Sequence, residues 1–473
     1  MEQPSSAQVE PEGGDAPQPG VVAGPVADVV DIAAVIDARP VGRFQVSVMV
    51  LLALCVVIDG FDVQSMGFVA PALMQAWHVS RIEMGPVFGA GLIGMLPGSL
   101  LMGPLADRVG RRPVLIGCSA FLGVCMLATA FASSLPQLLM LRFVTGVGLG
   151  GIMGNAIALA GEYSPSRRRA TLMMWVSCGF TGGAALGGML TALLIPAHGW
   201  RSVFVVGGIV PIVIALGMAF MLPESMQFMV ASGRGRQRLA NVLRRIAPEL
   251  SIHTGTRYVS AEPPHSGSRV TALFADGRAR VTLLQWGVNF MNLLNLFFLA
   301  NWLPTIATDL GYDVAHAAVI GTTLQIGGVL GTLAMGPLID RWGYFRVLGP
   351  CYLLASAAIV SMTSAASVSL LLLLAVVFIS GFGIVGGQPA NNSLSATLYP
   401  VTLRATGVGW SLGVGRAGSI VGPVVAGGLM QLHWNAQQLF CAAAVPALLA
   451  ASMIWLMSRD GLFKRAGQAA ETA

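Results

Sequence analysis

The sequence contains little charge: Asp, Glu, Lys and Arg together make up 10% of its 473 residues. Soluble globular domains carry roughly 25% charged residues. This shortage excludes a soluble enzyme, a disordered chain and, despite the net charge of +6, a nucleic-acid-binding protein. Hydrophobic residues make up 55% of the chain, and the mean hydropathy is +0.73. A membrane-spanning helix needs about 20 mostly apolar residues, so the composition predicts an all-α polytopic membrane protein with about a dozen spans.

Paired cysteines and catalytic constellations are also missing from the sequence. The six cysteines lie inside apolar runs without any Cys-x-x-Cys pair, which favours small buried side chains over disulfides or a metal site. The predicted spans hold no set of paired His, Cys and carboxylate groups, no Ser-His-Asp set and no phosphate-binding loop. These absences argue against an enzyme.

Apolar runs of spanning length form two sets of six, within residues 44–222 and 280–458. The runs lie at about 46–74, 84–104, 113–132, 136–161, 170–195, 201–222, 281–304, 318–338, 346–364, 368–396, 404–431 and 437–457. The polar composition of residues 1–43 predicts a flexible tail, with a short interfacial helix at residues 30–36. Residues 223–279 form a polar central loop, and residues 459–473 form a second tail.

Arginine sets the predicted orientation, because Lys464 is the only lysine. If both termini lie on one side, the loops of that side hold most of the arginines, including those of residues 167–169 and of the central loop. The opposite loops hold only Arg81 and Arg201. The positive-inside rule then places both termini and the central loop in the cytoplasm, and we expect a bacterial plasma (inner) membrane.

An internal repeat predicts the architecture. Residues 91–115 match residues 324–348, an offset of 233, and the two segments share Gly-Pro-Leu-x-Asp-Arg-x-Gly. Trp200 opens the sixth run, and Trp434 opens the twelfth at nearly the same offset. Two pseudo-symmetric six-helix bundles in parallel orientation, joined by a cytoplasmic loop, are the arrangement of the major facilitator fold.

The repeated segment of the first half, which runs from Gly103 to Arg112, resembles the signature between helices 2 and 3 of major facilitator transporters. We expect Gly103 to allow close helix packing and Asp107 to lie at a helix N-terminus, where a carboxylate is stabilised. The resemblance implies a cytoplasmic latch that locks the outward-facing state. A solvated turn whose arginines only set the topology is the alternative. The candidate gating residues are Gly103, Asp107, Arg108, Gly110, Arg111, Arg112, Glu162, Asp340, Arg341 and Arg404. For Glu162, beside the arginines of residues 167–169, a charge cluster at a helix end is the alternative.

Further segments resemble one group within that superfamily. They are Asp59-Gly-Phe-Asp62, Met66-Gly-Phe-Val-Ala-Pro71, Arg142-Phe-x-x-Gly-x-Gly-Leu-Gly-Gly, Glu162-Tyr-Ser-Pro, Trp302-Leu-Pro-Thr305, Gly387-Gln-Pro-Ala-Asn391-Asn, Arg404-Ala-Thr-Gly-Val-Gly-Trp410 and Gly415-Arg416-x-Gly. Together they are similar to the aromatic acid:proton symporters of the 4-hydroxybenzoate and protocatechuate type.

This resemblance implies uptake of an aromatic carboxylic acid, hydroxybenzoate-like or benzoate-like, by proton symport through alternating access. The implied partners are the small carboxylate, protons and the lipid bilayer, with no cofactor besides the co-transported proton, no nucleic acid and a monomeric working unit. The alternatives are a proton-coupled transporter of a non-aromatic organic acid, an exporter of such compounds, and a membrane sensor built on the transporter fold.

Four charged residues lie well inside predicted spans: Asp59, Asp62, Arg142 and Arg416. An ionisable group in the bilayer is costly unless it faces a cavity or a partner. Asp59 and Asp62 are neighbours on one helical face, and Arg142 lies at a similar depth. Two adjacent carboxylates resist ionising together, so we predict that Asp59, Asp62 and Arg142 carry the coupled proton. A static ion pair that joins two helices is the alternative.

Arg416 is the candidate substrate-binding residue, because no acidic residue of the second half lies at its depth and guanidinium matches carboxylate geometry. Pairing with backbone carbonyls, or with Asp59 or Asp62 across the cavity, is the alternative. Further candidates for the substrate site are polar and aromatic side chains, for which helix joining and core packing are the alternatives. These further candidates are Asn289, Asn292, Gln325, Gln388, Asn391, Trp286 and Phe61.

Overall fold

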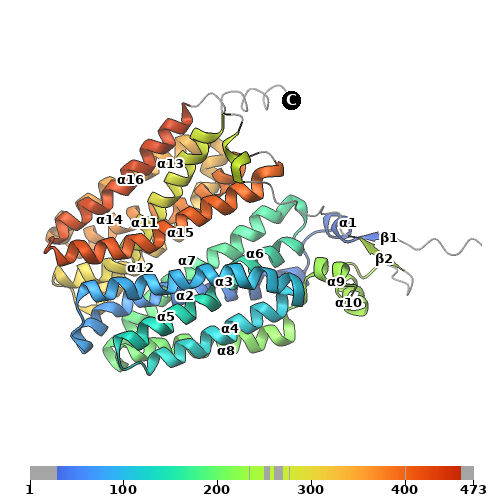
Figure 1. Cartoon of the computed structure of the whole chain (residues 1–473), viewed down its shortest axis with the longest axis horizontal. Helices are drawn as coiled ribbons and strands as arrows, with labels where there is room; N and C mark the ends of the chain where they lie inside the picture. The colour runs from blue at the N-terminus through green and yellow to red at the C-terminus, as the bar shows by residue number, and fades with distance from the viewer. Residues whose placement is uncertain are drawn as a thin grey trace, which may run out of the picture.

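The structure is a computed structural model that describes residues 29–233, 235–249, 256–259, 270–275, 277–399 and 401–459. Among these residues, twelve helical segments are long and apolar enough to cross a membrane. Figure 1 shows them as two bundles, one coloured blue to green and the other yellow to red. The predicted fold class, twelve spans in two six-helix bundles, is therefore confirmed.

The first bundle consists of α2 (Arg43–Trp77), α3 (Arg81–Val109), α4 (Arg111–Ala130), α5 (Leu135–Leu149), α6 (Ile152–Glu162), the short 3₁₀ turn η1 (Ser166–Arg168) with α7 (Arg169–His198), and α8 (Arg201–Met221). The second bundle consists of α11 (Ala279–Asp309), α12 (Val314–Trp342), α13 (Tyr344–Val368), α14 (Leu370–Thr397), α15 (Val401–Gln431) and α16 (Ala436–Ser458).

Local sequence signals set several helix ends. Ser80 and Glu83 form a capping box at the start of α3, which satisfies backbone N–H groups that have no partner inside the helix. Gly110 joins α3 to α4 with φ 105°, and Gly343 joins α12 to α13 with φ 80°. Because side chains disfavour positive φ, the repeated glycine of the two halves is explained by the same tight turn.

The fourth predicted run, 136–161, is one span but two helices. α5 ends at Leu149 and α6 begins at Ile152, with Gly150 and Gly151 between them. A Cβ atom at Gly150 would lie 2.5 Å from the Met95 carbonyl oxygen and from the Ser99 nitrogen of α3. The Gly-rich segment therefore lets the α3 backbone approach closely, and the helix is interrupted there.

The N-terminal tail and the central loop both contain regular structure. The strand β1 (Val29–Asp31) pairs in parallel with β2 (Arg257–Val259), so the fold is not purely helical. The helix α1 (Ile32–Asp37) lies where a short helix was expected, at residues 30–36, but it buries Ile32, Val35 and Ile36 in the protein core and does not present them to a membrane interface. The central segment also contains α9 (Met226–Ser232), α10 (Arg236–Ile246) and the turn η2 (Val270–Phe274). The rest of both tails and of the central loop lies outside the described residues.

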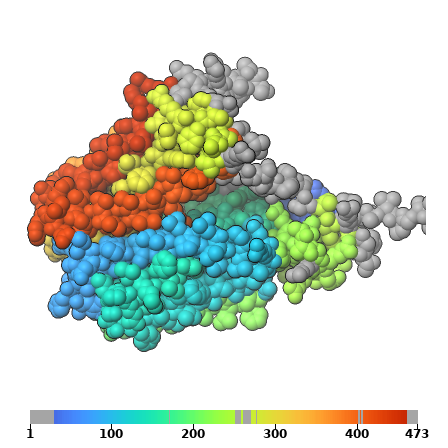
Figure 2. Space-filling model, viewed as in Figure 1, coloured from blue at the N-terminus to red at the C-terminus, as the bar shows by residue number. Residues whose placement is uncertain are grey.

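We call the side that carries α1, α9 and α10 the loop side, and the opposite side the far side. The two bundles meet closely on the far side: a Cβ at Gly67 of α2 would lie 2.6 Å from the Ala300 carbonyl oxygen of α11, and Gly85 of α3 faces Pro423 of α15. Figure 1 shows the bundles diverging toward the loop side, and Figure 2 shows the orange α15 lying directly on the blue α3. The structure is therefore closed on the far side.

Candidate functional site

A buried ion pair joins α2 to α5 in the first bundle. An Nη atom of Arg142 lies 2.7 Å from Oδ1 of Asp62, and the two side chains are 5% and 2% exposed. The guanidinium also lies over the Phe204 ring of α8, 5.8 Å from its centroid. The pair lines a cavity of about 20 Å³ together with Met95 and Asn301, which is room for about one water molecule.

Asp59 lies outside this ion pair. Its side chain is fully buried, and neither carboxylate oxygen has a hydrogen-bond partner among the described residues. The expected cluster of Asp59, Asp62 and Arg142 is thus an ion pair with a second, separate carboxylate nearby. Burial of an ionised carboxylate without a partner is expensive, so Asp59 is the group in this region whose charge is least well compensated.

Arg416 of α15 faces the first bundle across the interface. An Nη atom donates to Sδ of Met95 on α3 at 3.2 Å, and the guanidinium attracts Asp59 electrostatically without forming a direct ion pair. The alternative in which Arg416 interacts with Asp59 across the cavity is therefore partly realised. The side chain is only half-buried, so its guanidinium retains capacity for an anion.

Four of the predicted substrate-binding amides belong to one network inside the second bundle. Nε2 of Gln388 and Nδ2 of Asn391 donate to Oδ1 of Asn289 at 3.0 and 2.9 Å. Nδ2 of Asn292 donates to Oε1 of Gln388 at 2.7 Å, and Asn289 also bonds Ser411 of α15. The network joins α11, α14 and α15, as the helix-joining alternative expects. Of these four side chains, Gln388 is partly exposed and the other three are buried.

Three other amides are buried without satisfied partners. Both amide atoms of Gln64 and of Asn295, and Nε2 of Gln325, have no hydrogen-bond partner among the described residues. Gln64 lies one helical turn from Phe68, whose ring contacts Gly321 of α12, and Gln325 lies one turn from Gly321. Gln64 and Gln325 therefore come from opposite bundles and lie at the same level, just beneath the far-side contact. Gln64 is not among the residues predicted from the sequence, although a glutamine inside an apolar run is a visible signal.

The two predicted aromatic residues lie elsewhere. Phe61 packs against Gly187 and Gly207 inside the first bundle, which corresponds to core packing. Trp286 stacks on Trp410 with ring centroids 5.8 Å apart and meets Phe274 of η2 edge-on. It lies near the loop-side end of α11, and its partner Trp410 precedes Arg416 on α15 by six residues, which is less than two helical turns toward the loop side.

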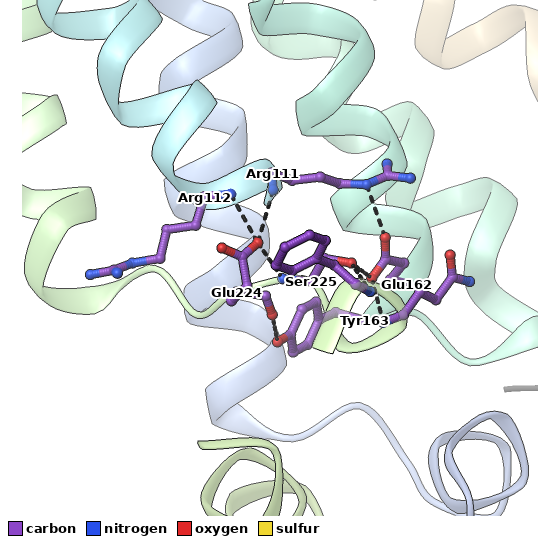
Figure 3. Close-up of polar contacts among 8 residues, drawn as sticks. Arg111, Arg112, Glu162, Tyr163, Glu224 and Ser225 are labelled. Carbon is purple, nitrogen blue, oxygen red and sulfur yellow. Dashed lines mark hydrogen bonds and ion pairs between the residues drawn. The ribbon is translucent and has the colours of Figure 1, made fainter. Parts of the chain in front are cut away.

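Glu162, at the foot of α6, is the centre of a loop-side cluster (Figure 3). Nε of Arg111 lies 3.1 Å from its Oε1, and Oγ of Ser225 donates to its Oε2 at 2.6 Å. The backbone N–H of Gln227 donates to the same oxygen. Glu162 therefore ties the start of α4 to the segment that leaves α8.

Glu224 caps α4 from that segment. Its Oε1 accepts the backbone N–H groups of Arg111 and Arg112 at 2.9 and 3.1 Å, groups that have no partner within their own helix. The Tyr163 hydroxyl donates to the Glu224 carbonyl oxygen at 2.7 Å. Burial raises the pKa of this phenol well above its usual value, so Tyr163 stays a neutral donor. Glu224 and Tyr163 were not selected from the sequence.

The remaining candidate gating residues make few contacts in this structure. A Cβ at Gly103 would meet no atom within 4 Å, so the expected close helix packing is absent there. Asp107 is exposed in the last turn of α3 and not at a helix N-terminus, and Arg108 beside it is exposed as well. In the second copy, Asp340 and Arg341 are exposed. The side chain of Arg404 lies outside the described residues.

Far-side contacts between the bundles were also missed from the sequence. Arg81 of α3 forms an ion pair with Asp309 of α11. Trp302 of α11 is fully buried, donates its indole N–H to the Pro423 carbonyl oxygen at 2.9 Å and meets the Phe88 ring edge-on at 5.1 Å. These contacts close the path between the bundles on the far side.

Comparisons with known proteins identify the family and the fold of the chain. The family model of the Major Facilitator Superfamily matches residues 52–262 and 286–472. The chain is 41% identical to the 4-hydroxybenzoate transporter PcaK of Pseudomonas putida over 89% of this chain and 94% of that one. It is 38% identical to a gallate transporter of the same species, over 91% and 95%. Among solved structures, a bacterial homolog of the human lysosomal transporter Spinster superposes with a TM-score of 0.69 at 18% identity, covering 88% of this chain and 97% of that one.

Proposed function

Because the chain belongs to the major facilitator superfamily, we propose that it takes up an aromatic carboxylic acid together with a proton by alternating access. The family makes it a multi-pass membrane transporter and not an enzyme. Two relatives named above are transporters of 4-hydroxybenzoate and of gallate, which supports an aromatic acid as substrate. The arginine-rich loops support placing the loop side in the cytoplasm of a bacterial inner membrane.

One observation carries the proposal: Asp59 of the first bundle and Arg416 of the second attract each other across the interface without a direct ion pair. A protonated Asp59 leaves the Arg416 guanidinium free to bind a carboxylate, whereas an ionised Asp59 competes with that carboxylate for the same cation. Proton and substrate anion therefore bind together and leave together, which is the requirement for symport.

The Asp62–Arg142 ion pair has a supporting role in this scheme. The guanidinium compensates Asp62 within a site that has room for about one water molecule. A single water there can relay a proton between the far-side path and the aspartates. In a structure closed on the far side, the proton and the substrate then leave toward the loop side.

The unpartnered amides support recognition of the aromatic ring substituent. Gln64, Asn295 and Gln325 are buried close to the far-side contact, and both amide atoms of Gln64 and Asn295 and Nε2 of Gln325 have no partner in the described part of the chain. A ring hydroxyl group both donates and accepts a hydrogen bond. We assign these amides to the hydroxyl end of the substrate, with the carboxylate end at Arg416.

The test is uptake of labelled 4-hydroxybenzoate into proteoliposomes, with and without an imposed proton gradient. Asp59→Asn should abolish gradient-driven accumulation but keep exchange of labelled for unlabelled substrate, because Asn resembles a permanently protonated Asp59. Asp313→Asn is the matched control: Asp313 is exposed and caps α12, and Asn caps a helix as well as Asp. Accumulation by Asp59→Asn equal to that of the unmodified protein would overturn the proposal.

Arg416→Lys tests the substrate end separately. Lysine keeps the charge but loses the planar fork, and a hydrogen bond to a charged group contributes about 1.5–3 kcal/mol, so KM should rise about 10- to 100-fold. An unchanged KM would exclude carboxylate binding by Arg416. Uptake of non-aromatic acids in place of aromatic ones would indicate a transporter of other organic acids. Net export would indicate an exporter, and substrate binding without transport would indicate a sensor.

A further inference from the structure

A pocket of about 360 Å³ lies on the loop side of the first bundle, outside the path between the bundles. Its walls come from the end of α8 and the segment after it, from α10, and from the start of α2 and of α4. Figure 1 shows α9 and α10 just beyond the loop-side ends of α4 and α8, and Figure 2 shows them as a yellow-green patch beside the first bundle. Its volume is within the range of small-molecule sites, roughly 300–1,000 Å³.

The pocket is positively charged. Among the described residues of its lining, Arg112, Arg238 and Arg245 are basic and Glu224 alone is acidic. Oε1 of Glu224 is already engaged by backbone N–H groups of α4 and of its own segment. Among the described residues, neither Arg238 nor Arg245 forms an ion pair; the Arg245 guanidinium lies over the Phe44 ring, 5.5 Å from its centroid. Two guanidinium groups thus line the pocket without an ion-pair partner among the residues that the structure describes.

The other wall of the pocket is apolar and continuous with the membrane-facing surface. Phe220 and Met221 end the span α8 and are 87% and 60% exposed. Large apolar side chains at the end of a membrane span contact the lipid. The pocket therefore lies at the level where lipid headgroups meet water.

We propose that this pocket binds the headgroup of an anionic phospholipid. The phosphate accepts hydrogen bonds from the Arg238 and Arg245 guanidinium groups, which match phosphate geometry, and the acyl chains lie along Phe220 and Met221. A basic amphipathic helix beside the end of a span is a favourable site for such lipids. α10 has this character: it buries Leu239 and Leu243 against the protein and exposes its arginines.

The apolar wall favours a lipid over a soluble phosphate ester. A soluble ligand would leave Phe220 and Met221 unused, whereas acyl chains cover both and add apolar contact area. The bound lipid would join α10 to the end of α8 and so hold the central segment against the first bundle.

The experiment measures retention of phosphatidylglycerol by the purified full-length protein in nanodiscs of phosphatidylcholine doped with phosphatidylglycerol, by native mass spectrometry. The test variant is Arg238→Gln/Arg245→Gln. The matched control is Arg236→Gln/Arg244→Gln, which removes the same charge from the same helix at positions that do not line the pocket. Arg238→Lys/Arg245→Lys keeps the charge, and the melting temperature reports folding for every variant.

Two pocket arginines contribute about 1 kcal/mol each, so the test variant should bind phosphatidylglycerol about 30-fold more weakly, with less than threefold loss in the control. Arg238→Lys/Arg245→Lys keeps the charge but loses the planar fork, so its binding should lie between that of the Gln variant and that of the unmodified protein. An equal loss of phosphatidylglycerol binding in the test variant and in the control would show that the lipid is attracted by the general charge of α10. That result would overturn the pocket as the binding site. Competition by soluble glycerol phosphate at equal concentration would show a site for free phosphate esters, and that result would overturn the lipid as occupant.

Discussion

Gly67→Ala should open the far side of the protein. Gly67 of α2 faces α11 of the other bundle, and a Cβ there would lie 2.6 Å from the Ala300 carbonyl oxygen and 2.9 Å from Cα of Asn301. Both neighbours are helix backbone that cannot rotate away. The added methyl group can be accommodated only if the two bundles separate at this level, so the far-side-open state becomes more populated.

The size of the shift follows from the overlap. Forcing one extra carbon into a packed contact costs about 1–3 kcal/mol, and each 1.4 kcal/mol is a tenfold change in an equilibrium. The ratio of far-side-closed to far-side-open protein should fall about 5- to 150-fold. Replacing glycine inside a helix also stabilises that helix by about 1 kcal/mol. Gly182→Ala on α7 is the control for this gain, because a Cβ there meets no atom within 4 Å.

The measurement is the electron–electron distance between spin labels at Ser133 and Ser367, which are exposed at the far-side ends of the first and second bundles. Cys441 is replaced by serine in all samples, since it is the exposed native cysteine. Gly67→Ala should add a population at longer distance, and Gly182→Ala should not. Identical distance distributions in the two variants would refute the reasoning that backbone contact at Gly67 closes the far side.

Three further predictions concern polar contacts outside the proposed transport site. Arg81→Ala should open the far side only slightly, less than about fivefold, because its ion pair with Asp309 is partly exposed and such pairs contribute about 0–1 kcal/mol; the same spin-label distances at low and high salt test this. Glu224→Ala should lower the melting temperature, since loss of a helix cap costs about 0.5–2 kcal/mol, and Glu224→Gln should lower it less. The backbone N–H of Ser166 donates to Asp37 at 2.6 Å and lowers the pKa of that carboxyl. The stability that this hydrogen bond contributes is therefore complete above the ordinary pKa of aspartate and is lost as the pH falls through the lowered pKa of Asp37. Asp37→Asn should increase hydrogen exchange of α1 at neutral pH.

The charged part of the site was predictable because charge is rare in the spans. Asp59, Asp62, Arg142 and Arg416 were identified by depth alone, and all four lie in or beside the region between the bundles. Their pairing was not predictable. Asp59 and Asp62 share one helical face, and which of them meets Arg142 depends on the rotation of α2 against α5. Only packing of the whole bundle decides that rotation.

The buried amides and the far-side contacts show a second limit of prediction from the sequence. Asn289 and Gln388 are polar residues in apolar runs, and the sequence does not distinguish a side chain that joins helices from one that waits for a ligand. The difference is whether a partner lies within hydrogen-bond distance, which the structure answers by satisfying Asn289 and leaving Gln64 unsatisfied. Arg81 and Asp309 are 228 residues apart, and each alone resembles an ordinary residue at a helix end.

The repeated fold carries unequal chemistry in its two halves, and this inequality favours coupling through the interface. The first bundle supplies Asp59 and the Asp62–Arg142 pair, and the second supplies Arg416. At an effective dielectric constant of about 20, two unit charges roughly 6 Å apart attract by about 3 kcal/mol, and at roughly 12 Å by about half of that. Rocking of the bundles that doubles such a separation changes the attraction between Asp59 and Arg416 by about 1.4 kcal/mol, a tenfold change in an equilibrium. Motion between two otherwise rigid halves would therefore suffice to change how strongly Asp59 competes with a substrate anion for Arg416 in the proposed coupling.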